Sequence, residues 1–135
     1  MSVLAFASAT ELAAAIKRRD ISAVELLTLY LERVDNYNGA LNAIVVDIRD
    51  RALEEAAAAD RALAGGEAPG PLHGVPMTIK ESYNLTGTPT TWGNPDWKDN
   101  VADEDAEAVK RLKAAGAIIF GKTNVPLSLA DFQSY

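Results

Sequence analysis

The sequence predicts an α/β protein: a helical N-terminal layer over residues 1–66, beside an incomplete mixed or parallel sheet with helices over 67–135. Two consecutive capping-box signatures in the first half predict the helices. Short, mostly β-branched apolar runs at 43–46, 75–80 and 117–120 predict the strands. A helical segment separates the last two runs, and strand, helix and strand in that order favour a parallel crossover. We expect one domain.

Three helices are expected in the first half. Ser8 and Ser22 each stand three residues before a glutamate, so side chain and backbone can satisfy each other's hydrogen bonds at a helix N-terminus. They predict helices over 8–19 and 22–38, the second ending at an Asn-Gly pair that favours a left-handed turn. Its wide apolar face indicates packing against more than one partner. An alanine-rich helix is expected over 48–64, closed by two glycines.

The second half carries the strand that ends at Lys80. Side chains alternate along a strand, so Val75, Met77 and Ile79 are expected to face a core together. Lys80 would then lie at the end of the strand, where α/β folds commonly present functional groups. Asp103 is expected to cap a helix over 103–115.

The C-terminal residues 127–132 are expected to form a helix that enters a longer fold. The acidic stretch 99–105 is interpreted as a solvated face and helix cap.

Composition excludes several classes of site. The net charge of −6 argues against a nucleic-acid surface, which needs clustered Lys and Arg. The chain has no cysteine and a single histidine, so disulfides are excluded and no metal or other cofactor is expected. No apolar run reaches the roughly 18 residues that span a bilayer. We therefore expect a cytoplasmic protein that binds neither membrane nor nucleic acid.

The most informative residues surround Lys80. They read Gly-Pro-Leu-His-Gly-Val-Pro-Met-Thr-Ile-Lys-Glu over 70–81 and Gly-x-Pro-Thr-Thr-x-Gly over 87–93. In order and spacing these segments resemble the lysine-bearing part of the amidase signature family. The likeness continues over 105–124, and the paired helices of 8–31 are also similar to the opening of these enzymes. The chain thus resembles the N-terminal portion of the amidase signature fold.

This resemblance implies a mechanism. Family members hydrolyse carboxamides to an acid plus ammonia or an amine with a Ser–cis-Ser–Lys triad, and the position that matches the lysine is Lys80. A lysine acts as a base only when neutral, which requires desolvation or cationic neighbours. The chain departs from the common pattern at Glu81, where many members have aspartate, and at Asn94, where many have serine.

Neither family serine is matched here. None of the serines lies in a glycine-flanked run, and Ser82, two residues after Lys80, matches neither position. The serines are Ser2, Ser8, Ser22, Ser82, Ser128 and Ser134.

Two basic residues have competing interpretations. His73 could act as a base, since histidine is a common general base, but a structural role in its Pro/Gly loop is favoured. Lys122 follows a predicted strand and could line the same cleft as Lys80, although a structural role is again favoured.

Four loop residues also have two interpretations. Thr90 and Thr91 could bond around Lys80 or simply end a loop, and the two readings are equally weighted. Trp92 and Trp97 could form a substrate wall, but covering the edge of the core is favoured.

Three functions are compatible with these observations. The favoured one is the N-terminal part of an amidase that supplies Lys80 but not the serines, and is therefore inactive alone. A split amidase completed by another chain and a non-catalytic binding or structural remnant are the alternatives. The partner in the complete enzyme would be a small-molecule amide, and uncovered sheet or helix edges predict a homo-oligomer.

Overall fold

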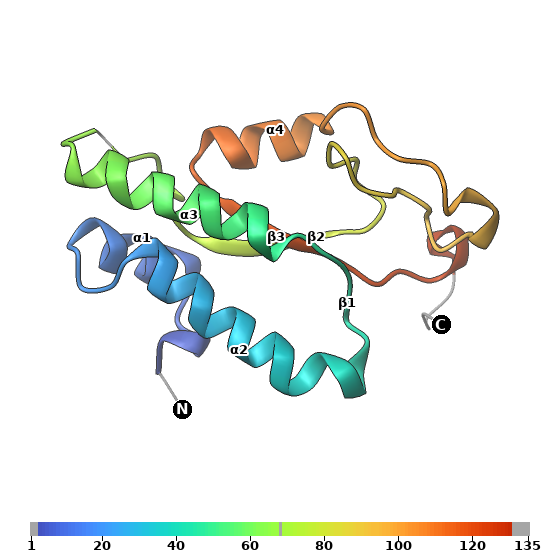
Figure 1. The fold of residues 1–135 in the computed structure, drawn as a ribbon, viewed down its shortest axis with the longest axis horizontal. Coiled ribbons are helices and arrows are strands. Elements are labelled where there is room, and N and C mark those ends of the chain that lie inside the picture. The colour runs from blue at the N-terminus through green and yellow to red at the C-terminus, as the bar shows by residue number, and fades with distance from the viewer. Residues whose placement is uncertain (1–2, 68, 131–135) are drawn as a thin grey trace.

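A computed structural model describes residues 3–67 and 69–130 of the chain. Within these residues the secondary structure alternates between helices and strands (Figure 1). The helices are α1 Ala9–Lys17, α2 Ala23–Leu41, α3 Arg49–Ala64 and α4 Glu107–Ala114. The strands are β1 Ile44–Asp47, β2 Pro76–Lys80 and β3 Ile118–Thr123. Short 3-10 turns lie at Val3–Phe6, Pro95–Trp97 and Leu127–Leu129.

The three strands form one mixed sheet in the order β1-β3-β2. β2 and β3 are parallel and joined through α4, which confirms the predicted crossover, whereas β1 runs antiparallel to β3. Ile79 is in register with Lys122, and Lys80 with Thr123. The carboxyl ends of β2 and β3 therefore meet at one edge of the sheet. The predicted class, a helical layer beside a small mixed sheet, is confirmed.

Both predicted capping boxes are present. The Ser8 and Ser22 hydroxyls accept hydrogen bonds from the backbone N–H of Glu11 and Glu25, whose carboxylates bond back to the cap residues. A carboxylate that the sequence did not indicate adds to the second cap. Asp60 of α3 accepts hydrogen bonds from the first two amides of α2, at 2.7 and 3.1 Å. The start of α2 is thus fixed to α3.

The predicted end of α2 at Asn38 is wrong. The helix continues to Leu41, and Asn42 adopts the left-handed conformation that closes it, with φ 48°. The Asn38 side chain instead bonds both the N–H and the C=O of Ile44, tying α2 to the first residue of β1. The Asn-Gly pair therefore marks a tertiary contact and not a helix end.

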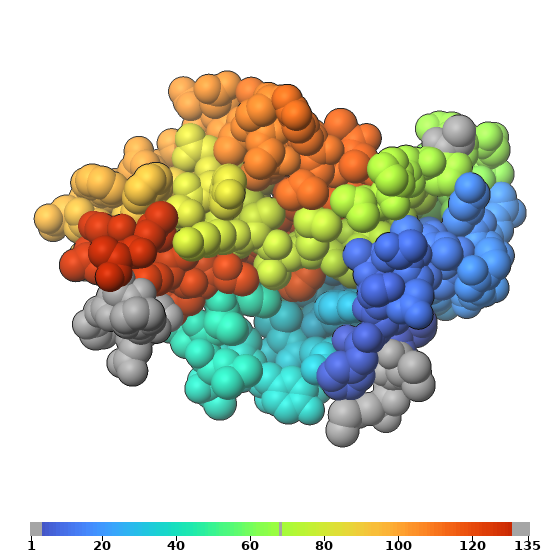
Figure 2. All heavy atoms as spheres, turned by 180° about the vertical axis from the view of Figure 1, so that it is seen from behind, coloured from blue at the N-terminus to red at the C-terminus, as the bar shows by residue number. Residues whose placement is uncertain are grey.

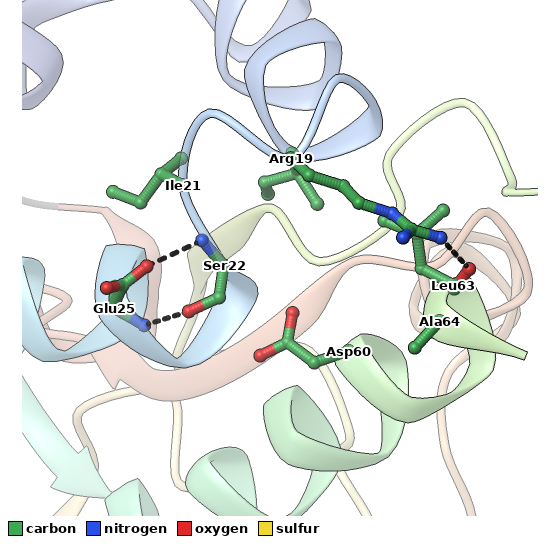
Figure 3. A pocket seen from close by; sticks show the side chains of 8 residues that line it. Arg19, Ile21, Ser22, Glu25, Asp60, Leu63 and Ala64 are labelled. Atoms are coloured by element: carbon green, nitrogen blue, oxygen red, sulfur yellow. Dashed lines mark hydrogen bonds between the residues drawn. The ribbon is translucent and has the colours of Figure 1, made fainter.

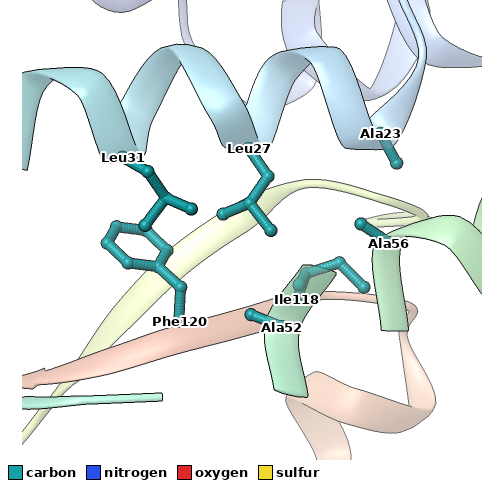
Figure 4. Close-up of a cluster of buried hydrophobic side chains, with 7 residues drawn as sticks. All are labelled: Ala23, Leu27, Leu31, Ala52, Ala56, Ile118 and Phe120. Carbon is teal, nitrogen blue, oxygen red and sulfur yellow. The ribbon is translucent and has the colours of Figure 1, made fainter. Parts of the chain in front are cut away.

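Apolar clusters lie on both faces of the sheet, with α2 and α3 on one face and α4 on the other. Figure 4 shows Leu27 and Leu31 pointing from α2 toward Phe120 of β3, with the small side chains of α3 alongside. A second cluster joins Leu26 of α2 to α1 and to Val75. The wide face of α2 is thus buried against several partners, as its pattern predicts.

Two expectations for the second half are wrong. Asp103 does not cap α4, which begins at Glu107 without a side-chain cap, and Asp105, expected in the first turn of that helix, instead accepts hydrogen bonds from Thr86 and Lys113. Asp105 is therefore a half-buried anchor rather than part of a solvated patch. Val75 and Ile79 do not share one core: Val75 joins the α1–α2 cluster, and Ile79 packs near α4. A register shift between Met77 and Thr78 accompanies this split.

The expected helix over 127–132 is also not found in its described part. Residues Leu127–Leu129 form a single 3-10 turn in which Ser128 has a left-handed φ of 53°. The last two residues of the expected helix lie outside the described residues.

Candidate active site

Lys80 is the last residue of β2, and hydrogen bonds hold the backbone on both sides of it. The Glu81 N–H donates to Thr123 O at 3.1 Å, and the Lys80 C=O accepts from Tyr83 N at 3.0 Å. The Thr123 hydroxyl donates to Ile79 O at 3.3 Å. The sheet and the following turn therefore fix the direction in which the Lys80 side chain leaves the strand.

The Lys80 side chain itself is exposed. Within residues 3–67 and 69–130, no hydrogen bond or ion pair holds its ammonium group. The loops around the strand end therefore do not bury the amine, so these residues do not supply the desolvation that a neutral lysine needs.

Glu81 points into the protein and is only 3% exposed. Its carboxylate accepts hydrogen bonds from the backbone N–H groups of Thr91 and Trp92, at 2.6 and 2.9 Å. Glu81 thus pulls the segment 88–93 back across the end of the sheet. Its charge is used inside the protein rather than in an ion pair with Lys80.

Lys122 is completely buried, one strand away. Its ammonium donates to the backbone oxygen of Pro89 and to the hydroxyl of Thr90, the second at 3.0 Å. Burial lowers the pKa of Lys122, and the nearby Glu81 carboxylate opposes this shift in part. Lys122 therefore does not line a cleft beside Lys80, and the structural interpretation holds.

The loop threonines bond to other partners than Lys80. Thr90 binds Lys122 through its hydroxyl, and Thr91 binds Glu81 through its amide. Trp92 and Trp97 are 43% and 48% exposed, so the prediction that they cover the edge of the core is wrong.

The left-handed backbone of Trp92, with φ 55°, lies in a tight loop. Trp92 O accepts from Ser128 N at 2.7 Å, which joins this loop to the segment after β3. Figure 2 shows the loop in yellow and orange beside the red segment that follows β3.

The remaining candidates are structural or unassigned. His73 Nε2 lies 3.0 Å from Ala59 O, a contact that joins its loop to α3, away from the strand ends. Ser8 and Ser22 are helix caps. Ser82 lies in the turn after Lys80, and Ser128 lies in the 3-10 turn after β3.

A cavity of about 260 Å³ lies elsewhere, between the α1–α2 turn and the end of α3 (Figure 3). Its polar groups already have partners: Arg19 donates to Leu63 O, and Asp60 caps α2. Figure 1 shows this region at the end of the molecule opposite to the carboxyl ends of β2 and β3. It has no direct part in the Lys80 site.

Within residues 3–67 and 69–130, no helix combines the length and apolarity that a bilayer crossing requires. The same residues contain no cluster of three or more histidines and carboxylates suited to a metal ion.

The fold and the site define an α/β protein with a lysine at the carboxyl end of a parallel strand pair, unpaired within the part of the chain that the structure describes. The family model described as Amidase matches residues 25–134. The chain belongs to the amidase family.

Relatives with different activities are similar to this chain in sequence. The indoleacetamide hydrolase of Bradyrhizobium diazoefficiens is 49% identical over 88% of this chain and 23% of its own length. The acylamidase of Rhodococcus erythropolis is 43% identical, over 90% and 25%. A glutamyl-tRNA(Gln) amidotransferase subunit from Aromatoleum aromaticum is 46% identical, over 88% and 24%. The chain spans about a quarter of the length of these relatives.

Solved structures agree with the fold. Fatty acid amide hydrolase matches with a TM-score of 0.89 and 27% identity, over 99% of this chain and 24% of that one. The native peptide amidase from Stenotrophomonas maltophilia gives a TM-score of 0.83 and 30% identity, over 93% and 26%. The fold is therefore the N-terminal part of the amidase signature fold.

Proposed function

We propose that this chain is the lysine-bearing part of a single amidase domain that hydrolyses carboxamides, with Lys80 as the final proton acceptor. One observation carries the proposal. The Lys80 ammonium stands exposed and without a partner among the described residues, on a backbone held at both sides by hydrogen bonds. The adjacent carboxylate of Glu81 is turned inward and does not occupy it.

The proposed reaction is a relayed acyl transfer. Neutral Lys80 would take a proton from a bridging serine, which would in turn deprotonate the nucleophilic serine. The nucleophile attacks the amide carbonyl, ammonia or an amine leaves with a proton, and water releases the acid from the acyl-enzyme. Backbone N–H groups would stabilise the negative oxygen of the intermediate.

This chain contributes the base and not the nucleophile. The described serines either cap helices or match neither family serine, and Lys80 is exposed. The two serines, and the residues that exclude water from the Lys80 side chain, must therefore come from the remaining three quarters of an amidase. The 135 residues alone are expected to be inactive, and the substrate is expected to be a small carboxamide.

We also expect the protein to be cytoplasmic. The isolated 135-residue chain is expected to form a homo-oligomer. β2 is an edge strand of the described sheet, and Phe6, Tyr37 and Leu41 are exposed. Unpaired strands and exposed apolar side chains favour association. Size-exclusion chromatography at increasing concentration should show a dimer or larger species, and a monomer throughout would contradict this.

A fusion protein tests the proposed activity. The chain is joined to the C-terminal three quarters of the Bradyrhizobium indoleacetamide hydrolase, and ammonia release from indoleacetamide is measured. The fusion should be active and the 135-residue chain inactive. Lys80→Met should lower kcat about 10³-fold, because general-base catalysis contributes on that scale.

Lys98→Met is the matched control, since Lys98 is also exposed but lies outside the strand ends. It should leave kcat unchanged. An active Lys80→Met fusion, or ammonia release by the isolated chain, would refute the proposal.

A further inference from the structure

Two buried charges hold consecutive residues of one loop. Lys122 binds the acceptor groups of Pro89 and Thr90, and Glu81 binds the donor groups of Thr91 and Trp92. The Lys122 ammonium therefore binds oxygens of residues 89 and 90, and the Glu81 carboxylate binds the N–H groups of residues 91 and 92. Hydrogen bonds to charged groups are shorter and stronger than neutral ones, so this segment is held more firmly than an ordinary turn.

The burial of these two charges indicates that they do more than stabilise the fold. Glu81 is 3% exposed and Lys122 is 0% exposed. Burying charges costs several kcal/mol of desolvation each, and apolar replacements of similar volume are often as stable. Yet an apolar residue could not bind the backbone groups of a tight loop. The charges thus serve to place the loop.

Glu81 also acts on Lys80, because the two are adjacent. Successive side chains in extended backbone point to opposite sides. Ile79 is buried, so the Lys80 side chain at the end of β2 is directed outward, and the bound carboxylate of Glu81 fixes the turn that follows it. Lys122 holds the other part of the same loop from β3. The pair therefore fixes both the base and the segment beside it.

We infer that Glu81 and Lys122 are positioning residues for amide hydrolysis: they hold the segment 88–93 across the ends of β2 and β3 and so set the direction of Lys80. The inference rests on the proposed function of Lys80. Neither residue touches the reacting atoms, and both act through the loop and the strand ends.

Kinetics of the fusion protein test the role in catalysis. Glu81→Gln keeps the shape of the side chain but replaces one acceptor oxygen by an NH₂ group. That group is a donor and cannot accept a hydrogen bond from a backbone N–H. The substitution should lower kcat per folded molecule at least about tenfold with KM within about twofold, because a misplaced base slows chemistry more than binding. Glu81→Asp keeps both acceptors and should recover most of kcat.

Combined and control variants separate positioning from folding. Lys122→Met should also lower kcat per folded molecule, and the double variant should fall no further than the worse single variant, because both act on one loop. Glu107→Gln, in an exposed ion pair with Arg111, should leave kcat unchanged. An unchanged kcat per folded molecule in Glu81→Gln would overturn the inference, whereas an active Lys80→Met fusion would overturn the proposed function instead.

Hydrogen exchange gives a readout that needs no activity. In the 135-residue chain the amides of Thr91 and Trp92 should be protected, and Glu81→Gln should speed their exchange at least about tenfold. Glu107→Gln should leave the exchange rates of these two amides unchanged. Exchange unaffected by Glu81→Gln would overturn the inference whatever the fusion does.

Discussion

The ends of β2 and β3 carry lysines in opposite environments. Lys80 is exposed and has no partner among the described residues, whereas Lys122 is completely buried and bound to the loop of Pro89 and Thr90. The register explains the difference, since Lys122 is paired with buried Ile79, and Lys80 with Thr123. Paired residues of neighbouring strands face the same side of a sheet, and the side changes with each residue.

One position along the pleat therefore decides which lysine is buried and which is exposed. The buried ammonium of Lys122 holds the loop, and the exposed side chain of Lys80 makes no such contact with the described residues. The same substitution should thus lower the stability of the chain at Lys122 and leave it nearly unchanged at Lys80.

Lysine-to-methionine substitutions make the largest contrast in stability. Lys122→Met should lower the free energy of unfolding of the 135-residue chain by about 3 kcal/mol, because it leaves a buried carbonyl and the Glu81 carboxylate without their cation. Lys80→Met should change it by less than about 0.5 kcal/mol, since surface substitutions rarely do more. Urea unfolding of both variants measures the difference.

Equal losses of stability in the two variants would mean that the register does not separate the two environments. A stable Lys122→Met variant would show that the loop does not depend on the buried charge.

Glycines in the same loop sharpen the comparison. Gly93 and Gly87 both have left-handed φ angles, +72° and +79°, but only at Gly93 would an added Cβ meet another segment, with Pro126 O at 2.8 Å. Gly87→Ala should cost about 1 kcal/mol for the backbone conformation alone. Gly93→Ala should cost about 2 kcal/mol or more, because the loop must also move away from Pro126.

Thermal unfolding of the two alanine variants measures the contrast. If Gly87→Ala destabilised the chain as much as Gly93→Ala, the contact between the loop and the segment after β3 would contribute nothing.

The sequence predicted the features that depend on near neighbours. Capping boxes join residues three apart, so Ser8 and Ser22 could be identified without tertiary information. Strand, helix and strand likewise gave the parallel pairing. The errors came from contacts beyond the nearest neighbours: Asn38 bonds Ile44, six residues on, rather than ending α2, and Asp105 bonds Thr86 instead of lying in the first turn of a helix.

The candidate site follows the same rule. The motif around Lys80 identified the lysine itself, but nothing in it indicated that Glu81 binds amides ten and eleven residues away. The partner of Lys122 lies 33 residues distant, so no local pattern marks that lysine as buried. Pairing a buried anion and a buried cation through one loop is a property of the folded chain alone.

The pH dependence of stability gives the smallest and most specific test of the two lysines. Burial lowers the pKa of Lys122 below its ordinary value of 10.5, with Glu81 opposing the shift in part. Below the folded-state pKa both states hold the proton, so stability does not vary with pH. Between that pKa and 10.5 the unfolded chain binds more protons, so stability rises with pH.

Wild type should therefore gain stability relative to Lys122→Met as the pH approaches 10.5, when both are unfolded with urea at several pH values. Other lysines cancel in this difference, including Lys110, whose pKa is raised by Glu104. A difference that stays constant or shrinks would show that Lys122 does not carry a desolvated charge. The contrast between the two strand ends would then be one of packing rather than of electrostatics.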